Sequence, residues 1–259
     1  MISRRELPHF IILLQKIQHS MGKNSFFQFK QFRINQDQCA MKVCTDSCVL
    51  GAYTAVETAI HILDIGTGTG LLALMLAQRT DSPIDAVEID EAAAQQANEN
   101  VKNSPWSHQI KVIQQDILQF SQTTLLPYDL IVCNPPFFSN HLKRKHSTQN
   151  VAMHGEALQL PELAQVVSTL LASTGRFITL LPPYESSQLE KNCFDYGLYK
   201  YEELQLFDYI EGKQIRTINS FSFTKDSTPQ TKTLYIKTSV DGTYTDDFIQ
   251  LLKPYYLNL

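Results

Sequence analysis

The stretch LDIGTGTG, residues 63–70, decides the fold. The run before it, AIHILDI (59–65), indicates a buried strand, and the apolar run after it, GLLALMLAQRT (70–80), is typical of a helix. Three alternating glycines are more than a tight turn needs, because one glycine already supplies the unusual backbone dihedrals. In sheets covered by helices on both faces, ligands bind at such strand-to-helix turns. The stretch therefore predicts a binding loop at the edge of such a sheet.

The chain beyond this loop keeps alternating between strand-like and helix-like runs. Four more runs indicate strands and two indicate helices: strands over 84–90, 109–116, 128–133 and 175–182, and helices over 91–104 and 161–174. This alternation predicts a mostly parallel sheet. Three strand-like runs follow at 200–210, 216–226 and 231–239. Their connections are too short for parallel crossovers, so we expect antiparallel pairing there.

Composition excludes several classes of protein. With 43% hydrophobic and 19% charged residues in 259, the chain is neither disordered nor fibrous. The apolar run FIILL (10–14) is too short to span a membrane, and no signal peptide is recognisable around it. Five cysteines, an odd number, without a secretory signal predict reduced thiols and a cytoplasmic protein. The net charge of -4 argues against indiscriminate nucleic-acid binding but leaves room for a local basic patch.

Cys39, Cys44 and Cys48 are close enough in sequence to suggest a metal site. They form no CxxC pair, and no nearby histidine offers a fourth ligand. We expect buried or half-buried thiols that behave as small hydrophobic side chains. These three cysteines therefore indicate no metal site.

The spacing of the glycines distinguishes between nucleotide-binding loops. A dinucleotide fingerprint GxGxxG needs its third glycine at position 71, where the chain has Leu71. The series Gly66, Gly68 and Gly70 preceded by Asp64 instead resembles class I S-adenosylmethionine-dependent methyltransferases. The resemblance implies a Rossmann-like α/β fold, with a mostly parallel seven-stranded sheet, antiparallel C-terminal strands and helices on both faces.

Acidic residues follow the next two strands along the chain. Glu88 ends the second strand, where a carboxylate can accept both hydroxyls of a ribose. Asp116 ends the third and offers an acceptor for an adenine amino group. Asp90 is better placed to cap the helix that begins at Glu91. Acids at this edge also suit a cationic sulfonium ligand better than an anionic dinucleotide.

The fourth strand ends in the motif NPPF, Asn134 to Phe137. An amino group conjugated with a ring is a poor nucleophile, because its lone pair is delocalised. The side-chain oxygen of Asn134 and the carbonyl oxygen of Pro135 can accept its two N–H bonds and steer the nitrogen towards tetrahedral geometry. Pro136 stiffens the turn, and Phe137 offers a face for stacking. No covalent nucleophile is needed, so we interpret Cys133 as a core thiol.

A longer resemblance narrows the substrate. The segment FFQFKQFRINQDQCAMKVCTDSCVLGAYT (26–54), together with the glycine loop, NSPW (103–106) and NPPF, resembles bacterial tRNA (adenine-N(6))-methyltransferases that modify the adenine 3′ of the anticodon in valine tRNA. The family implies tRNA, through its anticodon stem-loop, as substrate, S-adenosylmethionine as cofactor with S-adenosylhomocysteine as product, and no metal. It implies a catalytic group of Asn134, Pro135, Pro136 and Phe137. It also implies a cofactor site of Lys42, Thr45, Asp46, Asp64, Gly66, Thr67, Gly68, Gly70, Glu88, Ile89, Asp116, Ile117 and Asn134.

A basic run, NHLKRKH (140–146), directly follows NPPF. Lys143, Arg144 and Lys145 would lie at the mouth of the site in an otherwise acidic protein. We expect them to contact RNA phosphates, although the same run also suits a solvated loop. No membrane association and no obligate protein partner are evident.

The NPPF motif also occurs in enzymes that methylate DNA adenine or a glutamine amide of release factors. A release-factor enzyme normally carries a folded helical domain before the glycine loop, and the residues ahead of Asp64 are too few for one. A DNA enzyme usually has a long target-recognition insertion, and none is recognisable. A third alternative is a module that binds S-adenosylmethionine or RNA without turnover. The intact motif argues against it.

Residues 1–24 match no part of the family pattern. Met21 begins MGKNSFFQFKQF, which resembles a natural start. We interpret residues 1–24 as an N-terminal extension that is not native or is disordered, and residues 1–20 as either a misassigned upstream start or a dispensable extension. Residues 25–259 then form the methyltransferase domain.

Overall fold

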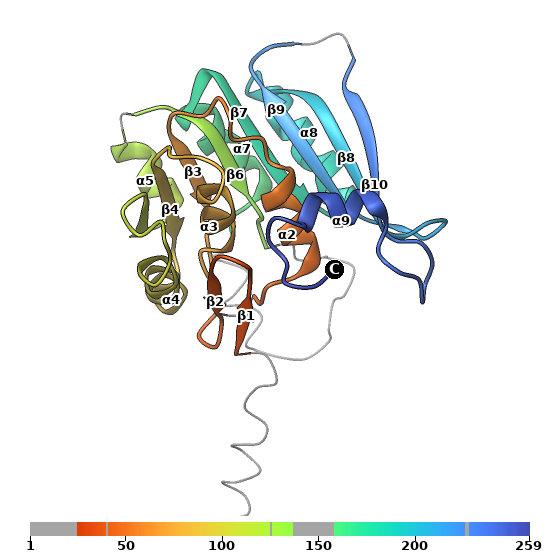
Figure 1. The fold of residues 1–259 in the computed structure, drawn as a ribbon. Coiled ribbons are helices and arrows are strands. Elements are labelled where there is room, and N and C mark those ends of the chain that lie inside the picture. The colour runs from red at the N-terminus through yellow and green to blue at the C-terminus, as the bar shows by residue number, and fades with distance from the viewer. Residues whose placement is uncertain (1–24, 40, 125, 137–157, 226–227) are drawn as a thin grey trace, which may run out of the picture.

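The computed structural model describes residues 25–39, 41–124, 126–136, 158–225 and 228–259. Their main feature is a mixed sheet of eight strands in the order β10-β8-β9-β7-β6-β3-β4-β5 (Figure 1). The strands are β3 (Ile62–Ile65), β4 (Ile84–Glu88), β5 (Ile110–Gln114), β6 (Tyr128–Cys133), β7 (Leu171–Leu181), β8 (Tyr199–Tyr209), β9 (Gln214–Ser222) and β10 (Gln230–Lys237).

The predicted architecture is confirmed. Strands β5, β4, β3, β6 and β7 pair in parallel, whereas β9 is antiparallel to both β7 and β8. These are the seven strands expected for the fold, and β10 adds an eighth at the edge. β10 pairs in parallel with β8, although we expected antiparallel pairing. β8 and β10 both run opposite to β9, so these two neighbouring strands are parallel to each other.

Helices cover both faces of the sheet (Figure 1). One hydrophobic cluster contains Ile62, Ile178 and Leu180, and the other contains Leu63 and Phe177. Side chains of β3 and β7 therefore alternate between two cores, as the pleat dictates. The first core takes in α2 (Thr45–Tyr53), α3 (Leu71–Ala77), α4 (Glu91–Lys102) and α9 (Asp246–Leu252), and the second α5 (Ile117–Thr123), α7 (Leu160–Leu170) and α8 (Pro183–Asp195).

Several predicted bounds differ by a few residues, and at the end of α7 the predicted helix runs into a strand. We expected a helix over 161–174, but α7 ends at Leu170 and β7 begins at Leu171. Leu171 pairs with Tyr128, and the register then shifts before Arg176 pairs with Leu130. The apolar residues of this irregular strand continue the helical spacing of α7, which hides the change from helix to strand.

The two ends of the described chain meet beneath the sheet. The hairpin of β1 (Phe26–Gln28) and β2 (Arg33–Asn35) lies beside the C-terminal segment (Figure 1), where Lys30 donates its backbone N–H to Tyr255 O at 2.8 Å. The predicted extension, residues 1–24, lies outside the described residues. Among the helices that the structure does describe, none has the length and apolar character that crossing a bilayer requires.

Candidate active site

The glycine loop joins β3 to α3 through three residues with left-handed backbones. Gly66, Gly68 and Gly70 have φ angles of 69°, 58° and 82°. Such angles cost a residue with a Cβ roughly 1–2 kcal/mol, which explains why the sequence alternates glycine here. The backbone N–H groups of Gly66 and Thr67 both donate to Val87 O, at 2.9 and 3.1 Å. The loop is therefore folded back on the end of β4.

Asp64 holds the loop from behind. Its Oδ2 accepts the Thr67 hydroxyl at 2.6 Å and the backbone N–H of Ala73 at 3.2 Å. Ala73 lies in the first turn of α3, and Gly70 at the N-cap has no side chain to offer. Asp64 thus supplies the cap from the preceding strand. Its side chain is fully buried, and burial raises the pKa of Asp64 to about 7.

Glu88 closes the loop from the side of β4. Its Oε2 accepts the backbone N–H of Gly68 at 2.8 Å, and its Oε1 accepts that of Asp90 at 3.0 Å. A carboxylate has about four acceptor sites, so each oxygen can still accept a ligand hydroxyl. Asp90 accepts from Ala93 N at 2.8 Å and caps α4, as the sequence predicts. Asp116 caps α5 through Leu118 N.

These parts surround a cavity of about 520 Å³, within the usual range for small-molecule sites of roughly 300–1,000 Å³. Eleven residues of the predicted site line it: Lys42, Gly66, Thr67, Gly68, Glu88, Ile89, Asp116, Ile117, Asn134, Pro135 and Pro136. They come from separate parts of the sequence. The topology of the sheet brings them together.

The charges of the cavity fit a cationic ligand. Glu88, Asp90, Asp116 and Glu162 line it, and Lys42 is the one basic side chain among its described lining residues. A pyrophosphate would be repelled by four carboxylates, whereas a sulfonium and an amino group would be attracted. The apolar walls include Ile89, Leu72 and Ile117, which can enclose a flat ring. The residues present therefore fit S-adenosylmethionine.

Asn134 stands where β6 ends and the cavity begins. Its Nδ2 donates to Ser47 Oγ at 2.8 Å, whereas its Oδ1 is buried without a hydrogen-bond partner among the described residues. A buried acceptor without a donor is costly, and because Asn134 lines the cavity, a bound ligand can supply the missing donor. Pro135 beside it is buried and Pro136 is exposed.

Cys133, which precedes Asn134, is a thiol of the core. Cys133 is almost fully buried, and burial raises the pKa of its thiol well above the ordinary value. The thiol stays protonated at neutral pH and is a poor nucleophile. Within the described residues, no group of three or more histidine, cysteine, aspartate or glutamate side chains is arranged to hold a metal.

Four predicted residues lie away from the cavity wall. Asp64 lies in β3 behind the loop, Gly70 is the N-cap of α3, and Thr45 begins α2. Asp46 forms an ion pair with Arg216 of β9, 2.8 Å between Oδ2 and Nε. Phe137, Lys143, Arg144 and Lys145 lie outside the described residues, so their predicted roles stay predictions.

The cavity is also lined by residues that the sequence did not indicate. Cys39, Met41, Ser47 and Gln115 line it. Ser47 directly follows Asp46 in the block TDSCVLG, and its place in this block is the sequence signal that could have indicated Ser47. Asn100 Nδ2 donates both to Asn35 O and to Thr69 O, which ties the end of β2 to the glycine loop, and Cys39 Sγ lies close to Gly68.

Comparison with known proteins gives many relatives. Residues 41–160 match the family model described as the methyltransferase small domain. The tRNA1(Val) (adenine(37)-N6)-methyltransferase of Cytophaga hutchinsonii is 45% identical over 237 residues, covering 91% of this chain and 99% of that protein. The enzyme of the same name from Bacteroides fragilis is 44% identical over 236 residues, covering 90% and 98%.

Solved structures support the fold. A predicted O-methyltransferase from Agrobacterium tumefaciens aligns with a TM-score of 0.61 over 83% of this chain and 100% of its own, at 17% identity. A putative class I S-adenosylmethionine-dependent methyltransferase from Listeria monocytogenes aligns with a TM-score of 0.54 over 90% and 73%, at 13% identity. At such low identity the likeness concerns the fold alone.

Proposed function

Because the chain belongs to the family of the tRNA1(Val) (adenine(37)-N6)-methyltransferases, we propose that it transfers a methyl group from S-adenosylmethionine to the exocyclic amino nitrogen of an adenine in tRNA. The target is the adenine 3′ of the anticodon in a valine tRNA, and the protein acts in the cytoplasm. The observation that carries this proposal is Asn134, whose anchored amide leaves a buried, unpartnered oxygen among the described residues at the cavity.

One end of the cavity binds the cofactor, and the other end binds the reacting amino group. Glu88 accepts the ribose hydroxyls, and Asp116 accepts the adenine amino group of the cofactor. Gly66 and Gly68 leave room for the methionine tail, since neither carries a side chain. When bound, S-adenosylmethionine supplies an electrophilic methyl carbon and leaves as S-adenosylhomocysteine.

The reacting amino group is held at the other end, beside β6. Asn134 Oδ1 and the Pro135 carbonyl oxygen each accept one of its N–H bonds, which draws the nitrogen lone pair out of conjugation and towards the methyl carbon. Phe137 gives the flipped-out adenine a stacking face, worth on the order of 1–3 kcal/mol. The nitrogen then loses one proton to solvent, and no side chain is covalently modified.

One experiment separates this function from its alternatives. The protein is incubated with methyl-labelled S-adenosylmethionine and, separately, unmodified total tRNA, total protein and DNA. We expect label in tRNA. Label in protein would support glutamine methylation, and cofactor binding without transfer to any fraction would support a non-catalytic module.

Asn134→Ala extends the same experiment. We expect it to abolish transfer and to leave the affinity for S-adenosylmethionine nearly unchanged, since Asn134 acts on the substrate amino group. Loss of cofactor binding would assign Asn134 to the cofactor instead.

A further inference from the structure

The Asn134 amide is held by a hydroxyl from another part of the chain. Ser47, in the first turn of α2, accepts the Asn134 Nδ2 at 2.8 Å and is only 4% exposed. Cys44 Sγ lies 2.9 Å from the same hydroxyl oxygen. Either atom of this contact can be the donor. When the Ser47 hydroxyl donates to Cys44, its lone pair faces Asn134 and accepts from the amide nitrogen, as in the structure.

The position of Ser47 is itself fixed by charged groups. Asp46 Oδ1 accepts the backbone N–H of Ser47 at 3.0 Å, and Asp46 Oδ2 pairs with Arg216. Arg216 comes from β9, on the far side of β7 from β6. The first turn of α2 is thus fastened to the sheet at two places, to β9 through Asp46 and to the end of β6 through Ser47. Asp46 does not line the cavity itself, but it holds Ser47, which does.

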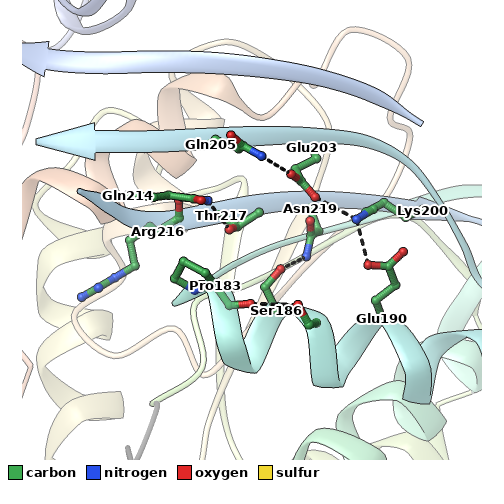
Figure 2. Close-up of polar contacts among 11 residues, drawn as sticks. Pro183, Ser186, Glu190, Lys200, Glu203, Gln205, Gln214, Arg216, Thr217 and Asn219 are labelled. Carbon is green, nitrogen blue, oxygen red and sulfur yellow. Dashed lines mark hydrogen bonds and ion pairs between the residues drawn. The ribbon is translucent and has the colours of Figure 1, made fainter. Parts of the chain in front are cut away.

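A second serine–asparagine pair in the protein can be compared with Ser47 and Asn134. Ser186, in the first turn of α8, accepts Nδ2 of Asn219 from β9 (Figure 2). Ser186 is also 4% exposed, and Asn219 Oδ1 also has no hydrogen-bond partner among the described residues. Such a pair can therefore merely fasten a helix to a sheet. Only the first pair lines the cavity, since Ser47 and Asn134 are among its walls and Ser186 and Asn219 are not.

We propose that Ser47 is a positioning residue, which accepts the Asn134 amide nitrogen and thereby turns the amide oxygen towards the substrate amino group. Without the hydroxyl, the amide can rotate by half a turn and present two donors to a group that needs acceptors. Ser47 does not touch the reacting atoms. The inference rests on the proposed function, because it takes Asn134 as the acceptor for the methylated nitrogen.

The kinetic test compares Ser47→Ala with the matched variant Ser186→Ala. We expect Ser47→Ala to lower kcat on tRNA about tenfold, the effect of losing one hydrogen bond that orients the acceptor, with the KM for S-adenosylmethionine unchanged. Ser47→Thr, which keeps the hydroxyl, should retain most of kcat. Ser186→Ala should lower the Tm without lowering kcat. Equal kcat for Ser47→Ala and wild type, or equal losses for both alanine variants, would overturn the proposal.

A second readout needs no turnover. The side-chain amide signals of Asn134 are assigned in a ¹⁵N–¹H spectrum by their absence in Asn134→Asp. They should move in Ser47→Ala and stay in place in Ser186→Ala. Unmoved signals in Ser47→Ala would contradict the contact. If the wild-type protein methylates no tRNA, the proposed function fails, and this spectrum still decides whether Ser47 contacts the Asn134 amide.

Discussion

The carboxylate of Glu88 accepts the backbone N–H of Gly68 at 2.8 Å, which binds the end of β4 to the glycine loop. Its other oxygen accepts the backbone N–H of Asp90. Two backbone donors fix the carboxylate before any ligand arrives, so little conformational freedom is lost on binding. Glu88 is therefore prepared to accept two further hydrogen bonds from a ribose.

Glu88→Gln should weaken cofactor binding. The glutamine amide can accept only one of the two backbone N–H bonds, and its nitrogen faces the other donor. We expect the Kd for S-adenosylmethionine to rise at least about tenfold, as is usual for hydrogen bonds to charged groups. The matched control is Glu91→Gln, whose carboxylate is exposed and contacts Gln95 on α4. Calorimetry measures both, and equal Kd values would refute the role of Glu88.

Gly68→Ala should affect stability and binding together. Gly68 and Gly197 both have left-handed backbones, with φ of 58° and 74°. Alanine at either position should lower the free energy of unfolding by about 1 kcal/mol. Only Gly68 lines the cavity, so only its substitution should raise the Kd for S-adenosylmethionine. If Gly197→Ala weakens binding as much, general destabilisation explains the effect.

Asp64 should make stability depend on pH. Burial raises its pKa to about 7 in the folded protein, so the folded state binds this proton more tightly than the unfolded state does. The stabilisation is complete below about pH 4 and is lost as the pH rises through 7. Between pH 5 and 7.5, wild type should lose about 2 kcal/mol of unfolding free energy relative to Asp64→Asn. Urea titrations measure both, and parallel pH profiles would contradict the raised pKa.

The basic run after NPPF should govern RNA affinity. Replacing Lys143, Arg144 and Lys145 with alanine should weaken tRNA binding and flatten its dependence on salt, by a slope of roughly 0.7–0.9 for each phosphate that is no longer neutralised. Exchanging lysine for arginine and arginine for lysine at the same positions keeps the charge and should keep the slope. Binding that stays unchanged across ionic strengths in the alanine variant would rule out a role for these side chains in holding RNA phosphates.

Local signals predict much of the fold. Strand β6 has the predicted bounds, because its apolar run is ended by two prolines. Asp90 caps α4 as expected, since an acid before an alanine-rich run acts on its immediate neighbours. Local signals do not predict the boundary between α7 and β7 at Leu170 and Leu171, because a helix and a buried strand both need apolar residues there.

Contacts between distant segments were not predictable in the same way. The ion pair of Asp46 with Arg216 and the hydrogen bond of Ser47 with Asn134 each join elements far apart in sequence. Neither segment carries a local sign of its partner. The resemblance of segment 26–54 to the methyltransferase family predicts Asp46 in the cofactor site. In the structure Asp46 does not line the cavity. Ser47, its neighbour, lies in the wall.

The most direct measurement uses one purified substrate. A valine tRNA transcript is incubated with S-adenosylmethionine and the protein, digested to nucleosides and analysed by mass spectrometry. A matched transcript carries guanine at the position 3′ of the anticodon. We expect N6-methyladenosine from the first transcript and none from the second. Equal N6-methyladenosine from both, or none from either while S-adenosylmethionine binds, would contradict the proposed function.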